Sequence, residues 1–300
     1  MNTVVLGGAG FIGSHLVDRL LAAGHGVDVI DDLSSGSLAN LADARAAGGA
    51  LKIHTLDATS SDLDALIGMR RPDVVYHLAL LPRDDRSAHA QGRGFTAALG
   101  LLEAARRHGV SKVVVALPAS ALYGHPPVNQ LPVKEGPLQP RGVRGVVARA
   151  IVDLLTTYRE RDDIEFTALA LASVYGPRQA PAGGVVAAFA CAASTGASPR
   201  FDGDGRQTRD FVFVDDVVDA LVRAGERGSG LVVNIGTGEQ TSLRELWALV
   251  SRGTGAEPEL QPARPDELVR FAVSPVRARI HLAWSPWTPL AEGVARLAAS

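Results

Sequence analysis

The sequence predicts an α/β fold in which helices cover a doubly wound parallel sheet, with a smaller C-terminal lobe that binds substrate. Short runs rich in β-branched residues alternate with longer segments of helical periodicity through the first half. A glycine-rich turn joins the first such run to the first helix. After about residue 175, glycine and proline become frequent and the alternation weakens. We therefore expect a first domain over residues 1–174 and a lobe formed mainly by residues 175–300.

The expected strands and helices follow in order along the chain. Apolar residues recur at helical spacing from Phe11 to Ala23, and Gly24 ends that helix. A later helix is expected over 100–109, and the intervening helices imply right-handed crossovers between parallel strands. Strands are expected at 3–7, 26–32, 51–57, 73–79, 112–118 and 165–176. Two later strands, near 211–214 and 231–235, are expected to belong to the first domain as well.

Composition is that of an ordinary globular protein. The 300 residues are 46% apolar, enough for a large core, and the net charge of −2 argues against nucleic acid as a partner. No signal peptide, membrane span or metal site is predicted.

Cys191 is the single cysteine, so we expect a cytoplasmic protein without an internal disulfide. Cys191 itself is expected to be a buried small apolar residue. His77 is expected to be a core histidine whose polar atoms are satisfied.

The glycine-rich turn has the spacing of a dinucleotide-binding loop. Gly8, Gly10 and Gly13 form a G-x-G-x-x-G pattern, and Gly7 precedes it. The first glycine of the pattern permits a tight turn, the second lets the backbone approach a pyrophosphate, and the third lets the helix pack closely on the strand. The helix N-terminus adds unpaired N–H groups. Because the pattern follows an expected strand and opens an expected helix, it predicts a dinucleotide cofactor.

An acidic residue, Asp31, lies at the end of the second expected strand. A carboxylate at this place accepts hydrogen bonds from the adenosine ribose and repels a 2′-phosphate. No arginine follows directly in the segment DDLSSGS. These features favour NAD over NADP.

With these segments placed, the chain resembles the extended short-chain dehydrogenases/reductases, and among them the nucleotide-sugar epimerases similar to UDP-glucose 4-epimerase. The resemblance spans nearly the whole length. It rests on segments in the family's order: GGAGFIGSHL, VIDDLSSG, YHLA, LLEAARRHGVSKVVV, ALYG, SVYGPRQ, GDGRQTRDFVFVDDV, NIGTG and LAWSPWTPLAEGV. It implies a Rossmann-type fold, NAD as cofactor, and a UDP-, dTDP- or GDP-linked sugar as substrate.

The resemblance also implies roles for single residues. Arg209 and Arg264 would hold the substrate diphosphate, since a planar guanidinium pairs well with phosphate oxygens. Ser173 stands where the family has an asparagine that contacts substrate. Those expected to contact the cofactor are Gly7, Gly10, Phe11, Ile12, Gly13, Asp31, Asp32, Ser34, Asp57, Ala58, Leu78, Ala79 and Leu80.

The family's catalytic pair is missing. Its members carry Y-x-x-x-K, in which the tyrosine exchanges the proton of the sugar hydroxyl and the lysine lowers the pKa of the tyrosine. No Y-x-x-x-K occurs in these 300 residues. An ungapped alignment from SVYGPRQ puts Arg144 and Ala148 at the pair. A match of QPRG to the family's SPYG puts Arg141 and Gly145 there instead.

Other residues would have to handle the proton. Ala119 stands where the family has a serine or threonine, with Ser120 one place later. Arginine is no base near neutral pH, but Arg144 could stabilise an alkoxide or a keto oxygen. Candidates for the acid or base lie in loops expected near the cofactor: Tyr123, His125, Asp84 and Asp85.

Three functions remain open. The first is an NAD-dependent nucleotide-sugar epimerase that transiently oxidises a ring carbon with a non-standard acid–base group. The second is a pseudoenzyme that binds NAD and a nucleotide sugar, and the third is a ketoreductase of a nucleotide-linked keto sugar. The resemblance also implies a homodimer. An apolar face for it, which could instead pack on the sheet, is Ile151, Val152, Leu154 and Leu155.

Overall fold

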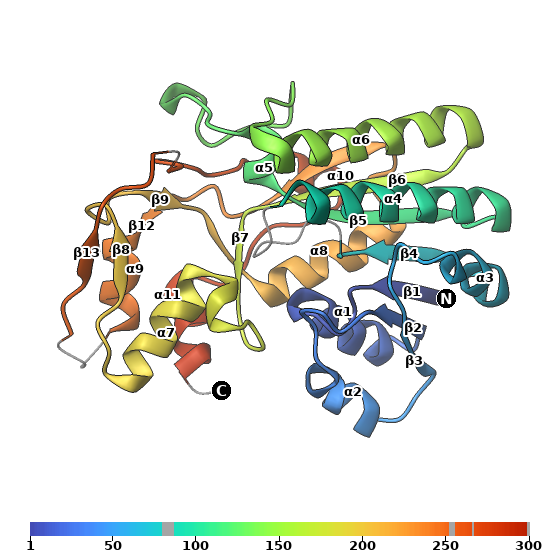
Figure 1. Cartoon of the computed structure of the whole chain (residues 1–300), viewed down its shortest axis with the longest axis horizontal. Coiled ribbons are helices and arrows are strands. Elements are labelled where there is room, and N and C mark those ends of the chain that lie inside the picture. Colours follow the sequence, from blue (N-terminus) through green and yellow to red (C-terminus); the bar gives the residue numbers. More distant parts are fainter. Residues whose placement is uncertain (80–86, 252–255, 266, 299–300) are drawn as a thin grey trace.

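The computed structural model describes residues 1–79, 87–251, 256–265 and 267–298. Within them, seven parallel strands form a central sheet in the order β11-β6-β5-β4-β1-β2-β3 (Figure 1). The strands are β1 (Asn2–Leu6), β2 (Gly26–Asp31), β3 (Leu51–Thr55), β4 (Val74–His77), β5 (Lys112–Pro118), β6 (Glu165–Leu171) and β11 (Leu231–Ile235). The predicted doubly wound fold is confirmed, and strand order reverses between β1 and β4.

Helices cover both faces of this sheet (Figure 1). Leu16 and Leu20 of α1 share one buried core with Val217 and Leu221 of α8, whereas α3, α4, α5 and α6 bury their apolar residues in a second core. On the first side lie α1 (Phe11–Ala22) and α8 (Val214–Glu226). On the other lie α3 (Asp62–Arg70), α4 (Ala88–His108), α5 (Ala119–Tyr123) and α6 (Gly142–Asp162). The short η1 (Leu38–Leu41), α2 (Ala42–Ala46) and η2 (Val128–Gln130) lie in connecting segments.

The sixth expected strand is divided in two. β6 stays in the central sheet, but β7 (Ser173–Tyr175) pairs instead with β10 (Phe211–Phe213) in a separate two-stranded sheet. Of the two later strands expected in the first domain, 231–235 lies in the central sheet as β11 beside β6, whereas 211–213 forms β10 beside β7. The pairing with β10 carries the chain from the end of β6 towards the lobe.

The lobe lies at the left of Figure 1, beyond the carboxyl ends of the strands. Phe189 packs between the rings of Phe201 and Trp247 at its centre. Buried Asp210 ties it to the sheet, accepting hydrogen bonds from the Gly238 and Val273 N–H groups. Its elements are η3 (Pro181–Gly183), α7 (Val185–Thr195), β8 (Arg200–Asp202), β9 (Thr208–Arg209), β12 (Thr241–Ser242), α9 (Leu243–Val250), β13 (Glu259–Gln261) and α11 (Leu290–Ala298), while α10 (Val276–His281) packs against β11.

Two expectations about buried residues need correction. Cys191 is exposed on α7, because that helix turns only Val186, Ala187 and Phe189 into the core. His77 is fully buried, but neither ring nitrogen has a hydrogen-bond partner in the part of the chain that the structure describes. None of the described helices combines the length and apolarity of a membrane span, and no described residues form a cluster suited to a metal ion.

Candidate cofactor and substrate cleft

One cleft of about 1840 Å³ opens at the carboxyl ends of the central strands and continues to the lobe. Open α/β sheets bind their ligands at this edge, where the strand order reverses. Every residue expected to contact the cofactor or the substrate lines the cleft, except Leu80, which lies outside the described residues. The cleft thus joins the two predicted binding regions in one continuous space.

The glycine turn is packed closely against the start of α1. A Cβ added to Gly13 would lie 2.1 Å from the Gly7 carbonyl oxygen, and one added to Gly10 would lie 3.2 Å from the same atom. Gly7 has φ +79°, a conformation that glycine adopts without strain. Helix α1 begins directly after Gly10, so its first N–H groups have no intrahelical partner. These features fit a dinucleotide phosphate.

Asp31 holds this turn in place. It is 8% exposed, and its Oδ2 accepts a hydrogen bond of 2.9 Å from the Ala9 N–H while its Oδ1 accepts one of 2.9 Å from the Leu33 N–H. Burial raises the pKa of Asp31, although these two N–H groups act in the opposite direction. Asp31 therefore orders the loop as well as standing at the expected ribose position.

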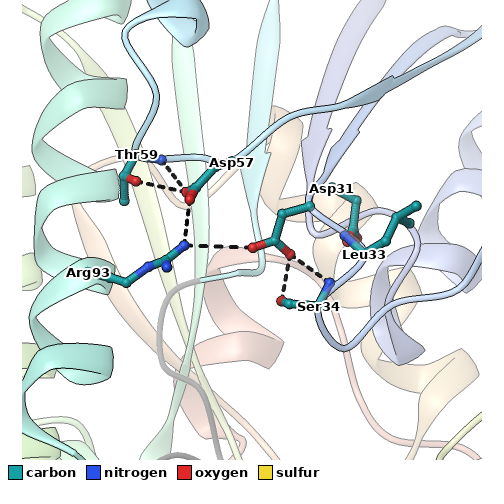
Figure 2. A network of polar contacts seen from close by, with 7 residues as sticks. Asp31, Leu33, Ser34, Asp57, Thr59 and Arg93 are labelled. Carbon is teal, nitrogen blue, oxygen red and sulfur yellow. Dashed lines mark hydrogen bonds and ion pairs between the residues drawn. The ribbon is translucent and has the colours of Figure 1, made fainter.

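A polar network forms the edge of the cleft next to β2 and β3 (Figure 2). Arg93 of α4 reaches Asp57, with 2.6 Å between Nη2 and Oδ2, and lies 3.7 Å from Asp32. The hydrogen bond from the Thr59 N–H does most to hold the pKa of Asp57 below its ordinary value. The Thr59 hydroxyl and Arg93 act in the same direction, whereas burial acts in the opposite direction. Sequence reasoning missed Arg93, since its partner Asp57 is 36 residues away and no local pattern marks the pair.

Arginines line the lobe end of the cleft. Arg209 is largely buried; its Nη2 is 2.6 Å from Glu267 Oε1 and its Nη1 donates to the Leu268 carbonyl at 2.5 Å. Arg264 pairs with Asp202 at 2.5 Å. Both predicted diphosphate ligands thus face the cleft already paired with an acid. Sequence reasoning also did not single out Arg200 of β8 and Arg178, which line the cleft; Arg178 pairs with Asp18 of α1 and Asp43 of α2.

The expected catalytic region contributes few polar side chains. Ser120 and Arg144 line the cleft, from α5 and α6 respectively. Ala148 is fully buried and Arg141 lies outside the cleft, near His125. Of the four residues that the two alignments place at the catalytic pair, Arg144 alone lines the cleft. In the ungapped alignment, Arg144 stands at the position of the tyrosine.

Comparison with known proteins now identifies the family. A sequence model of the NAD dependent epimerase/dehydratase family matches residues 3–236, which is most of the chain. The chain belongs to this family.

Individual relatives agree with this assignment. The chain is 44% identical over 309 residues to the UDP-glucose 4-epimerase of Mycolicibacterium smegmatis, covering 99% of this chain and 97% of that protein. The crystal structure of UDP-glucose 4-epimerase with UDP-glucose from Thermotoga maritima has a TM-score of 0.92 at 32% identity and covers 100% of this chain and 98% of that one. A Thermus thermophilus UDP-glucose 4-epimerase in complex with NAD has a TM-score of 0.89 at 32% identity, with 99% and 97% coverage.

Two of the residues predicted to replace the family's tyrosine are poorly placed. Tyr123 is buried outside the cleft; its hydroxyl donates to Asn234 Oδ1 at 2.7 Å, and burial raises its pKa well above the ordinary value. His125 is exposed but also lies outside the cleft, with its Nδ1 3.2 Å from Arg141 Nη1. The geometry argues against either as the base of an epimerase/dehydratase family reaction. Asp84 and Asp85 lie outside the described residues.

Proposed function

We propose that this chain is an NAD-dependent epimerase of a UDP-linked sugar, with a non-standard proton-handling group. The observation that carries the proposal is the single cleft that runs from an intact glycine turn to paired arginines in the lobe. The match to UDP-glucose 4-epimerases over the whole chain supports UDP among the nucleotides. The glycine turn and Asp31 would hold NAD, and Arg209 and Arg264 would hold the diphosphate.

The chain's own residues would orient the sugar and stabilise charge. NAD, when bound, supplies a hydride acceptor that can return the hydride. Ser120 can hydrogen-bond the reacting hydroxyl, and Arg144 can stabilise negative charge on its oxygen. Neither is a good base near neutral pH, and losing one acid–base group costs about 10²–10⁴ in rate. We therefore expect slow turnover unless another group in the cleft moves the proton.

A second candidate, an NAD- and nucleotide-sugar-binding pseudoenzyme, is favoured by a specific observation. Ala148 is fully buried and Ala119 has no hydroxyl, so two of the family's three catalytic positions cannot act in proton transfer. A ketoreductase, in which Arg144 polarises a ketone and water supplies the proton, is the third candidate.

A product analysis distinguishes these functions. Purified protein is incubated with NAD and a panel of UDP-, dTDP- and GDP-sugars, reduced cofactor is followed by absorbance, and products are separated by chromatography and identified by mass. The epimerase proposal expects an isomeric UDP-sugar. Saturable binding of both ligands with no new sugar would contradict it in favour of the pseudoenzyme. Net reduction of a UDP-keto sugar by NADH, without isomer formation, would indicate the ketoreductase.

Restoring the tyrosine–lysine pair tests which of the two alignments places it correctly on this chain. Arg144→Tyr with Ala148→Lys should raise the epimerisation rate by one or more powers of ten, the size of an acid–base contribution. The matched control is Arg141→Tyr with Gly145→Lys. A Cβ at Gly145 would lie 2.8 Å from the Ala121 carbonyl oxygen, so we expect this control to lose stability and gain no activity. A gain in the control alone would reverse the register.

The homodimer and the cytoplasmic location stay predictions. Of the four residues expected to form a dimer face, Ile151, Val152 and Leu155 are buried against the sheet. A dimer formed through α4 and α6, as the resemblance implies, would use the outer faces of these helices instead.

A further inference from the structure

The carboxylates of Asp32 and Asp57 each present one oxygen to Arg93. Figure 2 shows Arg93 beside Asp57. Asp57 Oδ1 accepts hydrogen bonds from the N–H and the hydroxyl of Thr59, both at 2.8 Å. Asp32 Oδ1 accepts bonds from the N–H and the hydroxyl of Ser34, at 3.0 and 2.6 Å. Each acid thus uses one oxygen to close its own turn and directs the other at the guanidinium. The guanidinium of Arg93 thus lies between two carboxylates.

This arrangement lines the cleft at the ends of β2 and β3. Resting on the proposed function, this is where the adenosine ribose of a dinucleotide would lie. NADP differs from NAD by a 2′-phosphate with a charge of about −2 near neutral pH. An acid beside the ribose excludes that phosphate, whereas a nearby arginine accommodates it. The structure holds both kinds of residue at the same place.

The balance of charge determines whether the acids or the arginine govern binding of a 2′-phosphate. Asp32 and Asp57 together carry more negative charge than Arg93 can neutralise, and Asp31 adds a third carboxylate to the same part of the cleft. The Arg93 side chain is about half exposed, with 48% of its surface open, so an incoming anion can reach it. Its donors are nevertheless directed at carboxylates, and a 2′-phosphate would have to displace at least one of them.

We propose that Arg93 is a latent partner for a 2′-phosphate, and that Asp32 and Asp57 make the chain select NAD over NADP by pairing with it. Selectivity then depends on the charges of Asp32 and Asp57 in addition to that of Asp31, and not on the lack of a basic residue. Neutralising the acids should release a binding site that already exists.

Direct binding of NAD and of NADP, measured by calorimetry, tests this proposal. The proteins are the wild type, Asp32→Asn/Asp57→Asn, Arg93→Ala and the triple variant, each freed of copurified nucleotide. Asparagine keeps the oxygen that closes each turn, so the double variant should still bind NAD. We expect its NADP affinity to rise on the order of tenfold, the size of one charge-assisted hydrogen bond. The triple variant should lose that gain.

Matched controls come from the same elements. Arg107→Ala removes an exposed arginine of α4 outside the cleft, and Asp153→Asn removes an exposed acid of α6. Both should leave the NADP-to-NAD affinity ratio unchanged, and thermal unfolding checks that every variant is folded.

The outcomes separate this inference from the proposed function. If the double variant gains no affinity for NADP, or keeps its gain after Arg93→Ala, the inference is wrong while NAD binding by the wild type still supports the function. A wild type that prefers NADP would also overturn it. A wild type that binds neither nucleotide would contradict the proposed function itself, and the inference with it.

Discussion

At the scale of single residues, the burial of His77 makes the stability of the fold depend on pH. It lies at the end of β4, fully buried, with two ring nitrogens that have no hydrogen-bond partner among the described residues. Burial lowers its pKa from 6.5 to about 3. Between these values the unfolded chain binds a proton that the folded chain excludes, so stability falls as the pH falls through this window. The loss rises to about 1.4 kcal/mol per pH unit once the pH is well below 6.5, where the unfolded histidine is fully protonated.

His77→Leu should remove this pH dependence. We expect the variant to equal or exceed the wild type at pH 7, because no unpaired nitrogen is buried, and to gain on it by about 1 kcal/mol per pH unit below 6. Urea unfolding at several pH values between 7 and 4.5 measures the difference. His281→Gln, which removes an exposed histidine of α10, is the control. Parallel stability curves for wild type and His77→Leu would show that the ring is not held neutral.

At the scale of elements, two glycines in neighbouring helices should respond in opposite ways. Gly100 of α4 has no heavy atom within 4 Å of an added Cβ, so Gly100→Ala should stabilise the protein by about 1 kcal/mol through helix propensity. Gly145 of α6 is packed against α5, 2.8 Å from the Ala121 carbonyl oxygen, so Gly145→Ala should destabilise it by about 1–3 kcal/mol. Urea unfolding at one fixed protein concentration compares the two. A destabilising Gly100→Ala would indicate that another surface covers this part of α4.

Sequence patterns could predict the features that neighbouring residues determine, but not those that depend on distant contacts. The strands β1 to β6 were predictable because each is a short apolar run between turn signals. The first turns of α4 were missed, since Gly92 and Gly94 weaken the helical pattern there. The division between β6 and β7 was missed too, because pairing with the distant β10 decides it. The glycine turn and its acid have a fixed local spacing, but Arg93 comes to Asp57 only through the packing of α4 on the sheet.

At the scale of the whole molecule, the site needs both parts of the chain. The second half returns to the sheet through α8 and β11, and Asp210 bonds the end of β9 to the segments at Thr237 and Val273. The cleft therefore has one wall from the sheet and one from a lobe that is tied to it. The proposed substrate and cofactor regions are consequently held in fixed relation by buried hydrogen bonds as well as by apolar packing.

The outer faces of α4 and α6 remain the place to test for a dimer. Ile151, Val152 and Leu155 face the core, but Val143 and Val146 of α6 and Leu99 of α4 are exposed apolar residues. Covering them would remove apolar surface from water, which favours association. We expect Val146→Glu to weaken dimerisation at least tenfold, since a carboxylate would be buried without a partner.

Light scattering over a range of protein concentrations measures this effect. Val128→Glu is the matched control, because Val128 is also 60% exposed but lies in η2, outside both helices. It should leave the mass unchanged. Equal weakening by both substitutions would point to a general effect of added charge, and a monomeric wild type at every concentration would contradict the dimer. A dimer that survives Val146→Glu would place the interface on another face of the molecule.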